Sequence, residues 1–170
     1  LDVQSIYDLV GDKIRDIFDR VNSGGTKLSA SDLMFAAMKE GWADIEANIE
    51  EVVEMLNDKR FTFDKDFVIK CLAVALDRGA ILKPEEMSDA EAETFSSDIE
   101  NNWPRIEAAF QELRDFVLSE LCLMGDKVIR SYSSFNPLFD YLYLHPKPDP
   151  QDRVLMRCYY YKSQMFNWFR

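Results

Sequence analysis

Residues 65–79, KDFVIKCLAVALDRG, carry apolar side chains around nearly the whole circumference of a helix. A helix that is apolar on every side is normally buried, so this one is expected at the centre of the fold. Asp64, directly before it, belongs to the residue types that cap helix N-termini. The segment therefore predicts a helical domain with this helix in its interior.

Segments on both sides of residues 65–79 carry apolar residues at helical spacing, which is typical of helices packed on a core. Pro104 suits the first turn of a long helix, and Gly125 suits its end. Two further helices are expected, one with Asn136 as its cap and Pro137 at its first position, and one that starts at Asp149 and Pro150. The two main stripes are Trp42, Ile45, Ile49, Val52, Val53 and Leu56, and Ile106, Ala109, Phe110, Leu113, Phe116, Val117, Leu121 and Met124.

These patterns predict an all-α or nearly all-α fold, a multi-helix orthogonal or bundle-like domain of about seven or eight helices. At most one or two short extended segments are expected, near residues 61–63 and 127–132. We expect residues 1–170 to form a single domain, with a helix–loop–helix over 1–41 and a helical bundle over 42–170. The chain begins with Leu1 and ends in mid-pattern at MFNWFR, as expected for a piece of a longer protein.

The composition limits the classes of partner. The chain has 20 Lys and Arg against 31 Asp and Glu, a net charge of −11, so on its own it is expected to repel the phosphate backbone of nucleic acid. No apolar run approaches the roughly 20 residues of a membrane span, and no signal-peptide pattern is present. We therefore expect a cytoplasmic protein with no membrane partner.

Cysteine and histidine give no sign of a metal or catalytic site. Cys71, Cys122 and Cys158 are far apart and each lies in an apolar helical pattern, so we expect buried reduced thiols. His145, the only histidine, lies between two nearby prolines in LHPKPDP and is expected to be a structural or solvated residue. No catalytic residue and no metal ligand is predicted.

The closing stretch, CYYYKSQMFNWFR (158–170), allows two interpretations. Its aromatic residues alternate with basic ones, as in a stacking strip for nucleic acid. A helix with its apolar face on the core and its basic side outward is the favoured interpretation, and in an intact protein that basic side can meet DNA. The residues assigned to the core face are Val154, Leu155, Cys158, Tyr159, Met165, Phe166 and Phe169, and the basic residues are Arg153, Arg157, Lys162 and Arg170.

Residues 15–33, RDIFDRVNSGGTKLSASDL, join two helical patterns through Asn-Ser-Gly-Gly. Gly24 and Gly25 allow a ligand to approach the backbone, and the helix after Ser29 directs unpaired N–H groups toward an anion. Arg20 can form a forked pair with phosphate oxygens, and Asn22 can donate to the same group. The alternative is a helix corner without a ligand, in which Arg20 pairs with a neighbouring aspartate, Asp16 or Asp19.

The segment IFDRVNSGGTKLSASDL (17–33) resembles a signature of the N-terminal domain of GmrSD-type modification-dependent restriction proteins, a ParB/sulfiredoxin-like family. The shared pattern is Phe-x-Arg-x-Asn-x-x-Gly-x-x-Leu-Ser. FTFDKDFVIKCLAVAL, NPLFDYLYL and the aromatic last helix also resemble the helical half of that domain. The matching motif residues are Phe18, Arg20, Asn22, Gly25, Leu28 and Ser29, with Gly24 beside them.

The resemblance implies a nucleoside triphosphate site with Arg20, Asn22, Gly24 and Gly25 as phosphate-binding residues. In the family, an upstream Asp-Gly-Gln-Gln-Arg motif supplies the rest of that site, and a C-terminal HNH-type domain often carries the nuclease. Neither is present here, so the chain is expected to need both as partners, to bind no cofactor alone and to meet DNA only through the full-length protein. The parent protein is then an NTP-dependent endonuclease of anti-phage defence. The alternative function is a helical protein-interaction scaffold with no nucleotide site.

Overall fold

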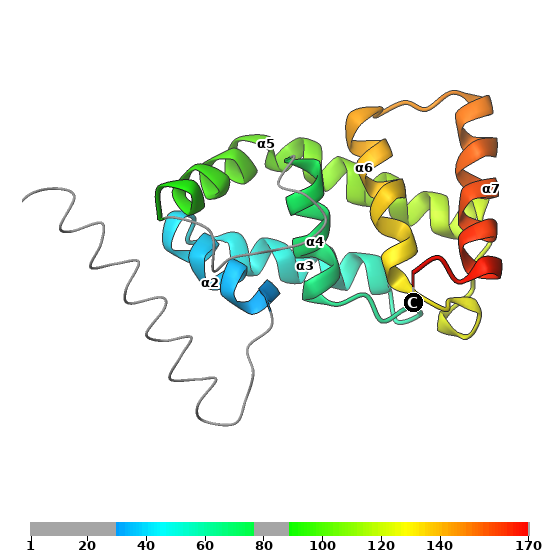
Figure 1. The fold of residues 1–170 in the computed structure, drawn as a ribbon, viewed down its shortest axis with the longest axis horizontal. Coiled ribbons are helices and arrows are strands. Elements are labelled where there is room, and N and C mark those ends of the chain that lie inside the picture. Colours follow the sequence, from blue (N-terminus) through cyan, green and yellow to red (C-terminus); the bar gives the residue numbers. More distant parts are fainter. Residues whose placement is uncertain (1–29, 77–88, 170) are drawn as a thin grey trace, which may run out of the picture.

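The computed structural model describes residues 30–76 and 89–169, and Figure 1 shows their arrangement. Within these ranges the chain is all-α and has no strand, which confirms the predicted fold class. Residues 61–64 are irregular, and 3₁₀ turns replace the extended segment expected near residues 127–132. The helices are α2 (Ala30–Gly41), α3 (Ile45–Asn57), α4 (Lys65–Ala75), α5 (Asp89–Asp115), α6 (Asn136–Leu144) and α7 (Pro150–Phe166), with a π-helical turn η2 (Phe116–Glu120) and 3₁₀ turns η3 (Asp126–Val128) and η4 (Tyr132–Phe135).

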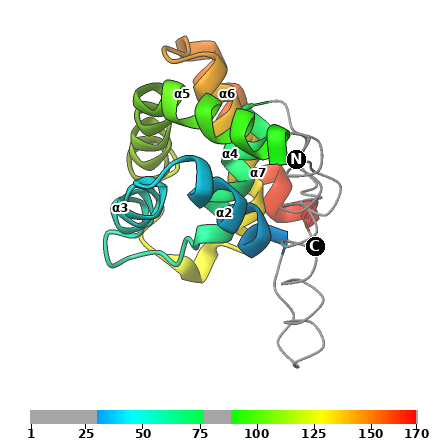
Figure 2. The same ribbon diagram turned by 90° about the vertical axis from the view of Figure 1, so that its left-hand side faces the viewer.

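Helix α4 lies among the other helices, as residues 65–79 predict. It packs against α2, α3 and α6, and both views show it between its neighbours (Figures 1 and 2). Its buried residues cover most of its circumference: Phe67, Val68, Ile69, Cys71, Leu72 and Ala73. The Asp64 carboxylate accepts a 2.8 Å hydrogen bond from the backbone N–H of Phe67, so the predicted N-cap is confirmed.

The irregular segment before α4 is held by one side chain. The Asn57 amide donates to the carbonyl of Phe63 at 2.8 Å and accepts from the N–H of Phe63 at 2.6 Å. The Phe63 ring then lies among aromatic neighbours, 4.5 Å from Tyr132 and 5.4 Å from Phe135. Because Asn57 satisfies the backbone of Phe63, the segment is ordered without a partner strand.

Helix α5 is one continuous helix with Pro104 in its interior, so the prediction that Pro104 starts a helix was wrong. An internal proline removes one backbone hydrogen bond and opposes straight helix geometry. Burial outweighs this cost, because Phe95 and Ile99 before the proline and Ile106 and Phe110 after it are all fully buried. The two halves therefore pack into the same core.

The end of the predicted stripe also differs. Leu121 lies in the core, but Met124 is 78% exposed. The π-helical turn η2 shifts the register, with Leu121 N–H bonded to the Phe116 carbonyl, and Cys122 then takes a left-handed conformation (φ 52°). Residues after the turn no longer follow the helical periodicity of α5, so Met124 leaves the core.

Helix α6 begins at the predicted place with a different cap. Asn136 has helical backbone angles, and it follows directly from η4 as the first residue of the helix. Its side-chain oxygen accepts from the thiol of Cys71 on α4 at 3.6 Å. The prediction that Asn136 caps the helix was wrong, because its side chain is used for a contact between helices.

Helix α7 starts where predicted, and it ends at an asparagine for which no helix end was predicted. Asp149 accepts hydrogen bonds from the N–H groups of Gln151 and Asp152, and Asp152 completes a capping box. Asn167 ends the helix in the left-handed conformation (φ 53°, ψ 48°), a role asparagine shares with glycine. The pattern therefore stops at Phe166, although the sequence continues with aromatic residues.

Helices α2 and α5 approach closely at Gly41. A Cβ atom at this position lies 2.6 Å from the Cβ of Ser96, which is shorter than two carbon atoms tolerate. Gly41→Ala is therefore expected to lower the free energy of unfolding by about 1–3 kcal/mol, although alanine favours helices. Thermal denaturation measures the change, with the exposed Ala36→Gly as the control for helix propensity in α2. A stabilising effect of Gly41→Ala contradicts the packing described.

Candidate functional site

The predicted phosphate-binding residues Arg20, Asn22, Gly24 and Gly25 lie outside the described residues. The other motif residues up to Ser29 do as well. The described chain begins with α2, whose Met34 and Met38 are buried in the same core as the helices after it. Helix α2, which directly follows the motif in sequence, is therefore part of the domain core.

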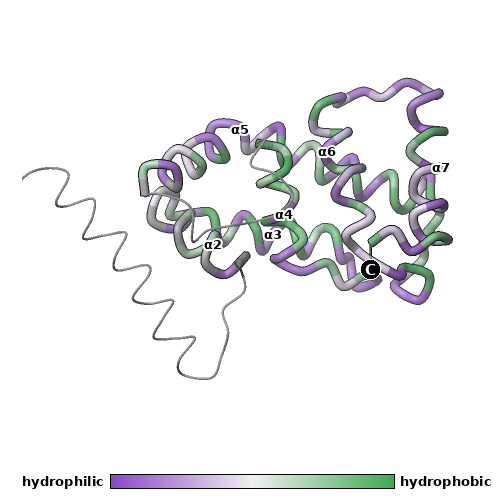
Figure 3. Tube along the Cα trace, viewed as in Figure 1, coloured by the Kyte–Doolittle hydropathy of each residue, from purple (hydrophilic) through white to green (hydrophobic). Residues whose placement is uncertain are grey.

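Helix α7 differs most from its prediction. Its buried residues are Met156, Tyr160, Ser163 and Gln164, whereas Val154, Leu155, Cys158, Met165 and Phe166 are exposed. The expected core face was therefore wrong for these five residues, whereas Tyr159 is partly buried against the core and Phe169 is partly buried. The helix has apolar residues on two faces, and the sequence pattern favoured the one that lies outside. Figure 3 shows hydrophobic and hydrophilic residues alternating along α7.

Two of the four basic residues expected on the outer side, Arg153 and Arg157, are paired with glutamates, whereas Lys162 is exposed as expected and Arg170 lies outside the described residues. Arg153 donates to Glu112 of α5 at 2.6 Å, and Arg157 donates to Glu120 of η2. These side chains are about two-thirds shielded from solvent, so the pairs contribute more than fully exposed ones do. The two arginines hold α7 against α5 and η2, and their charges are paired with carboxylates there.

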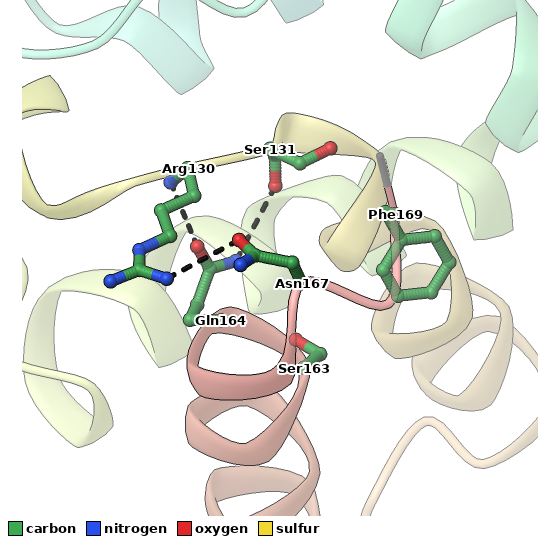
Figure 4. Close-up of a pocket in the computed structure, with 6 residues that line it drawn as sticks. All are labelled: Arg130, Ser131, Ser163, Gln164, Asn167 and Phe169. Carbon is green, nitrogen blue, oxygen red and sulfur yellow. Dashed lines mark hydrogen bonds between the residues drawn. The ribbon is translucent and has the colours of Figure 1, made fainter.

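A polar pocket of about 520 Å³ lies where the end of α7 meets the segment before η4. Figure 4 shows its lining: Arg130, Ser131, Ser163, Gln164, Asn167 and Phe169. One terminal nitrogen of Arg130 donates to the Asn167 side chain at 3.3 Å, and the side chain of Arg130 has no ion pair among the described residues. The pocket thus offers a cation, amide groups and an aromatic ring to a small polar ligand.

Gln164 connects the two walls of this pocket. Its amide oxygen accepts from the backbone N–H of Arg130 at 2.8 Å, and its amide nitrogen donates to the hydroxyl of Ser134 at 2.7 Å. Neither Gln164 nor Arg130 belongs to a motif that predicts a site. Asparagine is a residue type found at helix ends, so Asn167 could have been recognised as the end of α7. Nothing in the sequence pattern indicates the contact between Arg130 and α7.

Gln164→Leu is expected to lower the free energy of unfolding by about 1–3 kcal/mol, because it leaves the part-buried N–H of Arg130 and the buried hydroxyl of Ser134 without this partner. Urea denaturation measures the loss. Tyr160→Phe is a suitable control, since it removes a buried hydroxyl that has no hydrogen-bond partner among the described residues. That variant is expected to be as stable as the parent or more stable. Equal losses in both variants contradict the role given to Gln164.

The cysteines divide into two kinds. Cys71 is fully buried, and burial, followed by the nearby Asp140 carboxylate, raises the pKa of its thiol well above the usual range. Cys122 and Cys158 are exposed, so the prediction of three buried thiols was wrong for two of them. Cys122 leaves the stripe after the π turn, and Cys158 lies on the outer face of α7.

His145 lies at the end of α6, exposed, with its ring 4.5 Å from the ring of Tyr141. Across the described ranges, no group of three or more His, Cys, Asp or Glu side chains is arranged to hold a metal ion. In the same ranges, no helix is long and apolar enough to cross a membrane.

Comparison of the sequence with models of protein families found no match, and comparison with curated proteins found none either.

Proposed function

We propose that the chain is the helical part of the nucleotide-binding or sensor domain of a GmrSD-like modification-dependent restriction protein. The observation that carries this proposal is the segment IFDRVNSGGTKLSASDL (17–33), which places arginine, asparagine, two glycines and a helix start in the order of the family's signature. An all-α domain following the motif agrees with the proposal. The parent protein then acts in the bacterial cytoplasm as part of an anti-phage defence.

Four residues are proposed to contact the triphosphate. Arg20 supplies a forked pair of donors to phosphate oxygens, and Asn22 donates a further hydrogen bond. Gly24 and Gly25 leave the backbone accessible, and the N-terminus of the next helix favours negative charge. The remaining contacts come from the upstream Asp-Gly-Gln-Gln-Arg segment of the same protein.

The gene tests this proposal directly. Reading the frame upstream of the codon for Leu1 is expected to show an Asp-Gly-Gln-Gln-Arg segment, because the family's nucleotide site needs both halves. A complete gene that begins near residue 1 contradicts the proposal.

The 170-residue chain alone is expected to neither cleave DNA nor turn over nucleotides. Its single histidine cannot build a His-and-Asn metal centre, and the chain lacks a complete phosphate cradle. The measurement is incubation of pure chain with plasmid DNA and Mg²⁺, and separately with ATP and GTP. Metal-dependent cleavage that copurifies with the chain contradicts the proposal that the nuclease lies in a separate domain.

A protein-interaction scaffold without a nucleotide site is the second candidate. The exposed apolar face of α7 favours it, since single scattered apolar residues are normal on a surface but a contiguous set indicates a contact. The two candidates differ in one property: only the first requires Arg20 for nucleotide binding.

A further inference from the structure

Six apolar side chains lie exposed on one helix, α7. Phe166 and Met165 are 66% and 70% exposed, Leu155 is 59% exposed, and Val154 and Tyr161 are just under half exposed. Cys158 is exposed as well. At 100° per residue, Val154, Cys158, Tyr161 and Met165 fall within about 60° of one another, opposite Met156 and Tyr160 in the core. These four residues are called the α7 seam below.

Polar contacts account for much of the attachment of α7 to the domain. Arg153 and Arg157 pair with glutamates, Gln164 bonds to Arg130 and Ser134, and Tyr159 donates to the carbonyl of Ser134. The helix stands at the right-hand end of the described helices in Figure 1, and none of them lies beyond it on the outer side. No described residue covers this outer face, where side chains from Val154 to Phe166 are exposed.

The spacing of the α7 seam is symmetric on reversal. The steps between the four residues are four, three and four, so the row has the same spacing read in either direction. A two-fold axis near residues 159 and 160 therefore places Val154 against Met165 of a second helix, and Cys158 against Tyr161. Steps of three and four are those with which two helices interdigitate, and a two-fold contact needs a surface that complements itself.

We propose that α7 is the seam of a two-fold dimer of this chain, with the two α7 helices antiparallel. The proposal does not depend on the nucleotide site. Covering the exposed parts of the four seam residues together with those of the flanking Leu155, Phe166 and Trp168 removes on the order of 600–700 Å² per copy from water, somewhat less than the roughly 800 Å² per partner of a standard interface. We expect weak dimerisation, at tens of micromolar, because the interface is below the standard size.

Charge permits this pairing in spite of the net charge of −11. Lys162 is the one charged residue of α7 on the outer arc from Val154 to Phe166, and no carboxylate lies on that arc. Its aliphatic stem can cover apolar surface while the ammonium group remains in water. Pairing through this arc therefore brings no carboxylate of one α7 against a carboxylate of the other.

The first test compares two Met→Glu variants by sedimentation equilibrium of the 170-residue chain. Met165→Glu places a carboxylate in the seam, and Met124→Glu places the same charge at an equally exposed methionine outside α7. The wild type and Met124→Glu are expected to dimerise at tens of micromolar. Met165→Glu is expected to weaken dimerisation at least about 100-fold, with an unchanged melting temperature at low concentration.

The second test determines the direction of pairing. In a chain carrying Cys122→Ser and Cys158→Ser, Val154→Cys and Met165→Cys are made as separate proteins and oxidised alone and mixed. A disulfide between copies is expected only in the mixture, because the antiparallel register joins position 154 to position 165. A monomeric wild type at these concentrations overturns the proposal. So does equal disruption by Met124→Glu, or efficient crosslinking of Val154→Cys with itself, the parallel result.

Discussion

Replacing Phe110 with alanine is expected to lower the free energy of unfolding by about 3–5 kcal/mol, which is a large part of the 5–15 kcal/mol typical of a domain. Phe110 is fully buried on α5, and its ring centroid lies 4.1 Å from that of Phe139 on α6 in a stacked arrangement. The cavity left by the ring falls between two helices whose neighbouring residues also lie in the core. Those helices cannot close the gap without moving the core on both sides.

Phe166→Ala is the matched control, since it removes the same side chain from a position that is 66% exposed. Its free energy of unfolding is expected to change by less than about 0.5 kcal/mol at low protein concentration. Chemical denaturation followed by circular dichroism measures both. Similar losses in the two variants contradict the assignment of Phe110 to the core and Phe166 to the surface.

The sequence predicted those features of the fold that depend on neighbouring residues. Asp64 and Asp149 cap helices where expected, because an N-cap is recognised from a few adjacent positions. The stripe from Ile45 to Leu56 and the all-round apolar pattern of α4 correctly gave the buried residues. The apolar residues of each segment define only one possible core-facing surface, so the local pattern and the tertiary packing agree.

Features decided by distant contacts were not readable in the same way. Proline is common in the first turn of a helix, yet here the apolar residues on both sides of Pro104 pack into the same core and the helix is continuous. Asparagine is a common N-cap residue, but the side chain of Asn136 instead accepts a hydrogen bond from Cys71, 65 positions away in sequence. Both cases depend on which helices become neighbours, and no local rule contains that information.

Helix α7 shows the limit of periodicity most clearly. Its outer row of Val154, Cys158, Tyr161 and Met165 is as regular as its buried row, so apolar spacing alone cannot identify the core face. The deciding contacts are polar: Arg153 and Arg157 reach glutamates of α5 and η2. Their partners lie about 40 residues away, and many other carboxylates in this acidic chain fit equally well on sequence grounds.

The proposed nucleotide site rests on the motif of residues 17–33. Arg20, Asn22, Gly24 and Gly25 were selected from residue types and order, and they lie outside the described residues. The polar pocket at Arg130 and Gln164 had no counterpart in the sequence analysis, because it forms between segments that no motif connects. The predicted nucleotide site is therefore tested by measuring nucleotide binding directly.

Arg20→Ala in the full-length protein is expected to weaken nucleoside triphosphate binding about ten- to a hundredfold, because a charge-assisted contact to phosphate is worth roughly 1.5–3 kcal/mol. Its stability is expected to change little, since Arg20 lies outside the predicted apolar stripe and an arginine on the surface contributes little to folding. Arg15→Ala is the matched control, as it removes the same side chain from the same predicted helix at a position outside the motif. Arg15→Ala is expected to bind nucleotide as the wild type does.

Isothermal titration of full-length wild type, Arg20→Ala and Arg15→Ala with ATP, CTP, GTP and UTP tests this assignment most directly. The wild type is expected to bind at least one of the four, Arg20→Ala alone is expected to lose about ten- to a hundredfold in affinity, and all three proteins are expected to melt at similar temperatures. An unchanged affinity with a lowered melting temperature in Arg20→Ala, or no binding of any of the four by the wild type, contradicts this assignment and makes Asn-Ser-Gly-Gly a helix corner only.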